Sequence, residues 1–122
     1  MTSRNTKRTN KDFLNGIPEL LVLRLLDRKA MHGYELVQEI RVASHAKLEF
    51  GEGCIYPLLH KLMRNGLLSS RRDHVAGRTR VVYRVTAAGR KKLSTSISHW
   101  QTIADVVQLV VHGGEDVARS VA

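Results

Sequence analysis

The chain is poor in cysteine and in long apolar runs, and each scarcity excludes a class of protein. It has one cysteine among 122 residues, so an internal disulfide cannot form. No apolar run approaches the roughly 20 residues that a transmembrane helix requires. The basic N-terminus also lacks the apolar stretch of a secretory signal. We therefore expect a soluble protein of the cytoplasm.

Acidic and aromatic residues are scarce as well. Eleven Asp and Glu stand against 20 Lys and Arg, which gives a formal net charge of +9 and favours a polyanionic partner. Aromatic residues make up 5% of the chain, and no predicted strand carries the stacking aromatics of an RNA-recognition motif. A membrane-surface helix would need free bulky apolar residues, whereas the apolar faces here are required for a core. Double-stranded DNA is the favoured partner. The alternative is a basic protein that binds DNA or RNA without sequence preference, or a dimeric interaction protein without ligand response.

The signatures of enzymes and metal sites are also missing from the sequence. It has no nucleophile elbow, no glycine-rich phosphate loop and no paired carboxylates on one element. No set of His, Cys and Asp has the spacing of a zinc site. We therefore expect no catalytic residues, no metal and no cofactor.

Polarity divides the chain into four parts. Residues 1–12 predict a basic flexible tail, and residues 114–122 predict a second flexible tail. Residues 13–86 predict a compact domain, and residues 87–113 predict one long helix. A chain of this size buries only a modest core, so a partner subunit would stabilise it.

The predicted domain begins with two helices. Pro18 suits the first turn of a helix, because the N–H that it lacks has no partner there. The apolar residues that follow point almost all round the helix, so it must be covered on more than one side. Residues 31–44 predict a second helix with a single buried stripe. The stripe consists of Leu36, Val37, Ile40 and Ala43.

The stretch GEGCIYPLLHKLMRNGLLSS, residues 51–70, predicts a third helix with a proline near its start. If the cap lies at Gly53 or Cys54, Pro57 falls in the first turn and almost no intrahelical hydrogen bond is lost. Asn65-Gly66 would end the helix. At about 100° per residue, the apolar side chains gather on one side. The other side is cationic and aromatic and consists of Tyr56, His60, Lys61 and Arg64.

Beyond this helix the hydrophobic period becomes that of strands. Val81, Tyr83 and Val85 alternate with polar residues, and a loop containing Gly77 precedes them. Arginines surround this predicted hairpin, and Thr86 is placed as the N-cap of the last helix. Three helices followed by a basic hairpin form the plan of a winged helix-turn-helix. We therefore predict a mainly α fold with a small β-hairpin and a long C-terminal dimerisation helix.

The last helix carries a regular apolar seam whose members are four, three, four, three and four residues apart. It would span on the order of 40 Å at 1.5 Å per residue, which is longer than the domain that precedes it. A second copy is the natural cover for this seam and for the apolar first helix, so we predict a homodimer. The predicted interface consists of Leu21, Leu25, Leu93, Ile97, Trp100, Ala104, Val107 and Val111.

Three motifs carry a resemblance to a known family. They are MHGYEL (31–36), GCIYPLLHKLMRNGLL (53–68) and YRVTAAGRKKL (83–93). In these motifs the chain resembles the PadR-type transcriptional regulators, in their short form with one C-terminal helix. The resemblance extends over roughly residues 14–112. It implies a dimeric regulator that binds a pseudo-palindromic DNA operator, as a repressor released by a small aromatic ligand or another signal.

The predicted DNA contacts lie on the third helix and on the hairpin. Side chains of a rigid helix are well placed to reach base edges, whereas arginines on a flexible hairpin mainly neutralise phosphates. The hydroxyl of Tyr56 can donate a hydrogen bond to a phosphate. The candidates are Cys54, Tyr56, His60, Lys61, Arg64, Arg71, Arg72, Arg78 and Arg80.

Trp100 is the only tryptophan, and it lies midway along the last helix. Some regulators of the resembling family bind flat aromatic compounds between tryptophans of two subunits in this part of the helix. The resemblance therefore implies a ligand site at Trp100, with His99 beside it and Ala104 one turn further along. The plainer alternative is that Trp100 only packs the dimer interface.

Three other residues have alternative interpretations. Cys54 stands where the family usually has Ser or Thr, and it either replaces that residue or acts as a redox-sensitive thiol near arginines. His32 is expected at a helix start or in packing rather than as a metal ligand. Tyr34 and Tyr83 are expected as core or interface rings.

Overall fold

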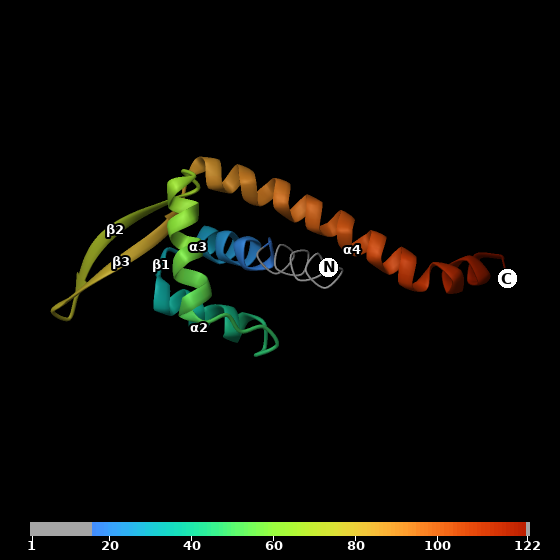
Figure 1. The fold of residues 1–122 in the computed structure, drawn as a ribbon, viewed down its shortest axis with the longest axis horizontal. Helices are drawn as coiled ribbons and strands as arrows, with labels where there is room; N and C mark the ends of the chain where they lie inside the picture. The colour runs from blue at the N-terminus through green and yellow to red at the C-terminus, as the bar shows by residue number, and fades with distance from the viewer. Residues whose placement is uncertain (1–15, 122) are drawn as a thin grey trace, which may run out of the picture.

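In a computed structural model of the chain, residues 16–121 are described, with side chains through residue 113. The N-terminal helix, residues 16–28, is followed by a small domain of helices and strands and then by a long helix that projects away from it (Figure 1). The elements after the N-terminal helix are β1 (Met31–His32), α2 (Gly33–Ala43), α3 (Glu52–Arg64), β2 (Leu68–Val75), β3 (Arg78–Val85) and α4 (Ala87–Val121). The predicted fold class is confirmed, and the tail predicted over residues 1–12 lies outside the described residues.

The strands form a three-stranded antiparallel sheet in the order β1-β3-β2. Sequence reasoning missed β1, because it assigned Met31 and His32 to the following helix. In the structure Met31 pairs with Tyr83 and His32 pairs with Val82. The helix begins at Gly33, two residues later than predicted, and His32 is its N-cap, because the His32 Nδ1 atom accepts a hydrogen bond from the Glu35 N–H, 3.2 Å away. The expectation that His32 lies at a helix start is confirmed.

The N-terminal helix forms the centre of the domain core. Val22 and Leu23 are fully buried, and Leu25 and Leu26 are 7% and 3% exposed. Other parts of the same chain cover this helix on several sides, which explains why nearly every side of it is apolar. Leu25, predicted in the dimer interface, therefore already packs inside one protomer, and Leu21 is half-buried.

The hairpin of β2 and β3 extends from this core, buried at its base and mostly exposed beyond it. Leu68 pairs with Val85 at its base, and Val75 pairs with Arg78 at its tip. The turn needs two residues with positive φ, which are Ala76 at 52° and Gly77 at 77°. Two successive positive φ angles are characteristic of a type I′ turn, whose twist matches that of the strands it joins.

The start of α3 differs from the prediction. Its N-cap is Gly51 and its first residue is Glu52, so Pro57 is the sixth residue of the helix rather than a member of the first turn. The proline therefore removes one intrahelical hydrogen bond, the one that its N–H would donate to the Gly53 carbonyl. Gly53 is exposed, so water can reach that carbonyl.

The end of α3 follows the prediction. Asn65 is the C-cap, and Gly66 has a φ of 74°. The Leu67 N–H donates to the Leu62 carbonyl over 2.9 Å, and the Gly66 N–H donates to the Met63 carbonyl over 3.0 Å. This is the Schellman pattern, which requires a left-handed residue and so favours glycine.

The long helix α4 begins at the predicted cap. The Thr86 hydroxyl accepts a hydrogen bond from the Gly89 N–H over 3.1 Å. The helix runs to Val121, so the end expected near His112 is wrong. Gly113 and Gly114 each disfavour helix by only about 1 kcal/mol, and Glu, Ala and Arg follow them. Within the described chain, no helix combines the length and hydrophobicity needed to cross a membrane.

Candidate nucleic-acid interface

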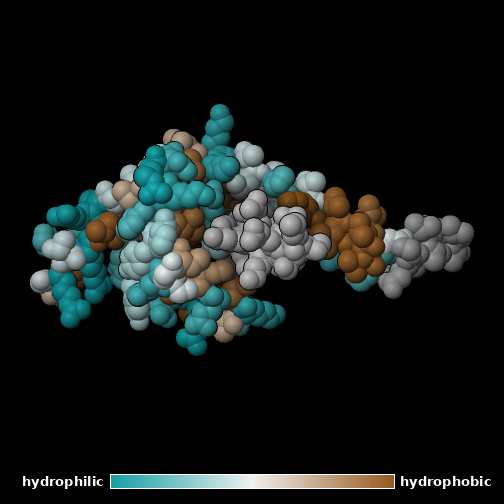
Figure 2. Space-filling view, viewed as in Figure 1, coloured by the Kyte–Doolittle hydropathy of each residue, from teal (hydrophilic) through white to brown (hydrophobic). Residues whose placement is uncertain are grey.

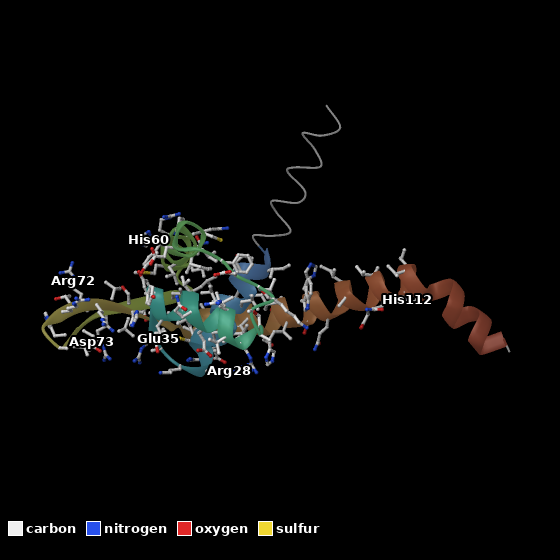
Figure 3. All side chains as sticks on the ribbon, turned by 90° about the horizontal axis from the view of Figure 1, so that it is seen from below. Arg28, Glu35, His60, Arg72, Asp73 and His112 are labelled. Atoms are coloured by element: carbon white, nitrogen blue, oxygen red, sulfur yellow. The ribbon has the colours of Figure 1, made fainter. Side chains whose placement is uncertain are left out.

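Helix α3 has the two faces that its sequence predicts. Ile55, Leu59 and Leu62 are fully buried and hold it against the domain. On the opposite side His60 and Lys61 are exposed, and Figure 3 shows His60 pointing away from the rest of the domain. A helix anchored on one face presents the other face at a fixed angle. The exposed residues of the predicted DNA-binding set on this helix are Cys54, His60, Lys61 and Arg64.

Tyr56 is less exposed than the other residues of that outer face. It is half-buried and packs against the core, although the helical projection grouped it with Lys61 and His60. Its ring lies over Gly33, where a Cβ atom would come within 2.6 Å of the ring carbon Cε1. Gly33 therefore allows α2 and α3 to approach closely. Contact with α2 turns the Tyr56 ring toward Gly33, so Tyr56 lies only partly on the outer face, where it lines an open recess together with His60 and Arg78.

The arginines of the wing, the hairpin formed by β2 and β3, divide between two faces of the sheet. Arg72 pairs with Val81, on the face that also carries Tyr83, whereas Arg71 pairs with Val82 on the other face. Figure 3 shows Arg72 on the same side of the hairpin as His60, with Asp73 on the opposite side. The division follows from the two-residue period of a strand. Arg72 thus shares its side with α3, and Arg78 lies beside the turn.

A short network joins the start of α2 to the wing. The Arg80 Nη1 atom lies 3.2 Å from the His32 Nε2 atom. The Glu35 carboxylate lies 3.8 Å from the same nitrogen and 3.3 Å from the Lys29 ammonium. Arg80 therefore lies beside His32 at the start of α2.

Tyr83 forms part of the buried base of the wing. It is 4% exposed, which confirms its prediction as a core ring, whereas Tyr34 is 55% exposed and is not a core residue. Burial raises the pKa of the Tyr83 hydroxyl, and the neighbouring Tyr56 raises it further. Tyr83 therefore stays neutral and anchors β3 against the helices.

Cys54 lies in the first turn of α3 and is an exposed free thiol. Its N–H donates to the carbonyl of Gly51, the N-cap, over 3.0 Å, so the cap lies two to three residues earlier than expected. Cysteine in place of Ser or Thr therefore costs no side-chain cap here. In the described chain, no group of three or more His, Cys, Asp or Glu residues could hold a metal ion.

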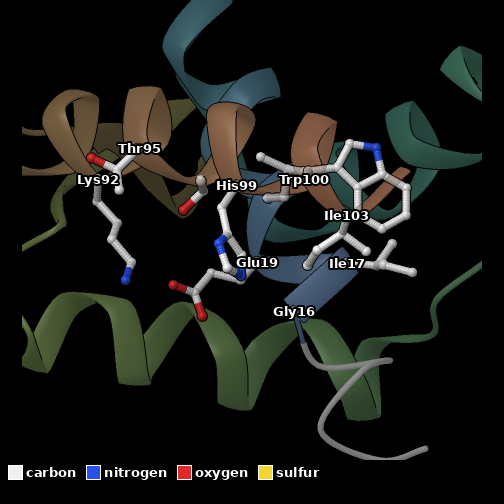
Figure 4. A pocket seen from close by; sticks show the side chains of 10 residues that line it. Gly16, Ile17, Glu19, Lys92, Thr95, His99, Trp100 and Ile103 are labelled. Carbon is white, nitrogen blue, oxygen red and sulfur yellow. The ribbon is translucent and has the colours of Figure 1, made fainter. Parts of the chain in front are cut away.

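A separate cavity of about 530 Å³ lies between the N-terminal helix and α4. Figure 4 shows Trp100, Ile103 and Ile17 at one end, and Lys92, Glu19 and His99 at the other. Trp100 and His99 were predicted ligand residues, whereas Ala104 is not among the residues that line the cavity. Ile17, Glu19 and Lys92 were missed, because only the packing of two helices distant in sequence brings them together.

Beyond this cavity α4 exposes an apolar surface. Figure 2 shows hydrophobic residues grouped on the part of the helix that extends past the domain. Val107 is 52% exposed and Val111 is 64% exposed, whereas Leu93 is buried at 3%. The predicted seam is therefore covered near the domain and uncovered further along. Other exposed apolar residues of this part are Val106, Leu109 and Val110.

A helix held on the core with a cationic outer face, beside a basic two-stranded wing, defines a winged helix-turn-helix protein. The model of the transcriptional regulator PadR-like family matches residues 22–95. The chain belongs to this family, whose members are transcriptional regulators that bind DNA, not enzymes.

Known relatives agree with this assignment. The chain is 37% identical over 84 residues to the transcriptional regulator Rv3488 of Mycobacterium tuberculosis, covering 69% of this chain and 76% of that protein. Its structure is similar to that of a PadR family regulator from Eggerthella lenta, with 28% identity, a TM-score of 0.71 and coverage of 91% and 96%. A regulator from Clostridium thermocellum is 25% identical with a TM-score of 0.75, over 80% of this chain and 95% of that one.

Proposed function

We propose that the protein is a sequence-specific, dimeric repressor in the cytoplasm that binds a pseudo-palindromic operator. The observation that carries this proposal is the arrangement of α3 and the wing. Lys61 and His60 project from a helix anchored by fully buried residues, and Arg72 lies on the same side of the wing. This arrangement suits a helix in the major groove with a basic hairpin on the adjacent backbone.

Dimerisation is supported by the uncovered apolar surface of α4. Water contact with Val107, Val111 and their apolar neighbours is unfavourable, and a second α4 would remove it. The two recognition helices would then contact half-sites about one DNA turn, or 10 base pairs, apart. Two-fold symmetry of the protein requires the matching symmetry in the operator.

Release by a small aromatic ligand is supported by the cavity between the N-terminal helix and α4. Its apolar end, at Trp100, suits an aromatic ring, and its polar end, at Lys92 and His99, suits a hydrogen-bonding group. The same two helices carry the predicted dimer contacts. A ligand that changes their packing would change the spacing of the recognition helices.

The experiment distinguishes side chains that contact bases from side chains that contact backbone phosphates. Operator sequences are first selected in vitro with the full-length protein, and binding is then measured at several salt concentrations on operator and on scrambled DNA. Lys61→Ala should change the preference between operator variants, because a base contact is worth about 1–3 kcal/mol at one position. Arg78→Ala should weaken binding to all sequences and flatten the slope of log K against log salt by roughly 0.9 per lost contact.

The opposite pattern would contradict the assignment of the two elements. If Arg78→Ala alters sequence preference with an unchanged salt slope, the wing reads bases and the helix positions the protein. A wild-type protein that binds operator and scrambled DNA equally would contradict sequence-specific regulation altogether.

A further inference from the structure

The end of α3 and the start of α4 are joined through one residue, Thr86. Its hydroxyl donates a hydrogen bond to the Gly66 carbonyl over 2.7 Å, and the same oxygen accepts from the Gly89 N–H over 3.1 Å. Its own N–H donates to the Leu67 carbonyl over 3.1 Å. Figure 1 shows the start of α4 beside this end of α3. Thr86 therefore contacts the segment that ends α3 and the first turn of α4 at the same time.

The two backbones are also packed closely at this point. Gly89 is buried, and a Cβ atom there would collide with the carbonyl oxygen of Leu67. This oxygen belongs to the backbone, so it cannot rotate away as a side chain could. A hydroxyl has a single proton to donate, and in Thr86 that proton is directed at Gly66. A tilt of α3 against α4 would therefore either break this hydrogen bond or press Leu67 against Gly89.

Helix α4 carries this fixed arrangement away from the domain. It is continuous from Ala87 to Val121, and Leu93 anchors its first part in the core at 3% exposure. Val107, in its exposed apolar part, lies on the order of 30 Å along the helix from Thr86 at 1.5 Å per residue. In the proposed dimer that part of α4 sets the positions of both α4 helices. The position of each α3 then depends on how firmly Thr86 holds it to its own α4.

We propose that Thr86 is a positioning residue for operator recognition, which fixes the distance between the two α3 helices and so the half-site spacing. It acts through α3 and lies outside the predicted set of DNA contacts. One inserted base pair rotates a half-site by about 36° around the DNA axis, since a turn contains 10–10.5 base pairs. Two α3 helices held rigidly cannot follow that rotation. The inference rests on the proposed function and assigns the choice of spacing to one hydroxyl.

The test compares operators that differ only in half-site spacing. An operator is selected in vitro with the full-length protein, and one base pair is then inserted or removed at its centre. Affinity for the three duplexes is measured by fluorescence anisotropy. The wild type should lose about tenfold or more on either altered spacing, comparable to a mismatched base pair. Thr86→Val should lose less than about threefold, because without the hydrogen bond α3 can follow the displaced half-site.

Two further substitutions at the same position separate the bond to α3 from the cap of α4. Thr86→Asp keeps a favoured N-cap acceptor for Gly89, but an ionised carboxylate has no proton to donate to Gly66. It should show the same reduced discrimination as Thr86→Val. The added charge lowers affinity for all three duplexes alike, so the ratio of affinities is unaffected. Thr86→Ser keeps the hydroxyl and should discriminate between spacings as the wild type does.

Two controls separate positioning from loss of stability or of any hydroxyl. Ile40→Val shortens a side chain that is 1% exposed in α2, and it should lower stability with the spacing preference unchanged. Thr102→Val removes a hydroxyl that donates to the Ser98 carbonyl within α4, and it should also keep the preference. Thermal unfolding shows which variants fold, and Thr86→Asp provides the test if the valine variant does not.

The possible outcomes distinguish this inference from the proposed function. Full discrimination between spacings in Thr86→Val or in Thr86→Asp would overturn the inference. So would a wild type that binds the three spacings equally, or an Ile40→Val protein that loses discrimination as far as Thr86→Val does. A selected operator without two half-sites would instead contradict the proposed dimeric function.

Discussion

The hydroxyl of Thr86 donates a hydrogen bond of 2.7 Å to the carbonyl oxygen of Gly66, which ties the start of α4 to the end of the recognition helix. The same hydroxyl accepts from the Gly89 N–H, and the Thr86 N–H donates to the Leu67 carbonyl over 3.1 Å. A Cβ atom on Gly89 would collide with the Leu67 carbonyl oxygen and come within 2.7 Å of Val85. The motif T-x-x-G, residues 86–89, therefore holds the start of α4 against the end of α3 and is called the clamp below.

Thr86→Val should destabilise the protein by about 1–2 kcal/mol, because it removes a helix cap and leaves the Gly66 carbonyl without its donor. Thr86→Ser keeps the hydroxyl and should lose less than half as much. Urea unfolding measures both. Equal stability of the valine variant and the wild type would show that the clamp contributes nothing.

Gly33→Ala should weaken the contact between α2 and α3, because the added methyl group overlaps the ring of Tyr56. We expect a loss of about 1–3 kcal/mol in the free energy of unfolding, as for other overpacked sites. Tyr56→Ala in the same chain removes the overlapping ring. A double-mutant cycle on unfolding free energies should therefore show strong coupling, and additive losses would mean that the two residues do not collide.

Val107→Asp should dissociate the proposed dimer, because it places a carboxylate on each side of a two-fold apolar interface at a cost of several kcal/mol. Thr102→Asp introduces the same charge at an exposed position on the opposite side of α4 and should leave the dimer intact. Sedimentation at micromolar concentration compares them. A Val107→Asp protein that remains fully dimeric would place the interface elsewhere.

Ser96→Phe should obstruct the cavity beside Trp100, because residue 96 lines it and the added benzyl group would occupy space that an aromatic ligand needs. In the wild type, binding of a planar aromatic compound should quench the fluorescence of Trp100, the only tryptophan. Quenching should be lost in Ser96→Phe and retained in Ser98→Phe, where residue 98 is exposed outside the lining. Quenching that survives Ser96→Phe would show that aromatic ligands bind elsewhere.

The raised pKa of Tyr83 predicts lower stability in alkaline solution. The unfolded chain ionises this hydroxyl near its ordinary pKa of about 10, while the folded protein resists ionisation because the group is buried. The stability is therefore fully present below that pH and is lost as pH rises through the higher folded value. Tyr83→Phe should reduce the loss, which urea unfolding at neutral pH and at pH values above about 10 can measure.

The features that the sequence determined are those with local causes. The two faces of α3 and its Asn65-Gly66 end follow from the helical period and from the need for a positive φ. The Thr86 cap and the turn at Gly77 depend in the same way on neighbouring residues. The division of Arg71 and Arg72 between two faces could also have been read from the strand period.

Other features were decided only by the tertiary structure, because they depend on which segments pack together. Met31 and His32 form a strand because they pair with the edge of β3. The local sequence at these two residues does not by itself predict a strand. Tyr56 turns inward because Gly33 leaves room for its ring, and Leu25 is buried because its own chain surrounds the N-terminal helix. The cavity at Trp100 joins segments far apart in sequence. Periodicity describes the faces of one element, whereas contact between elements depends on how several faces fit at once.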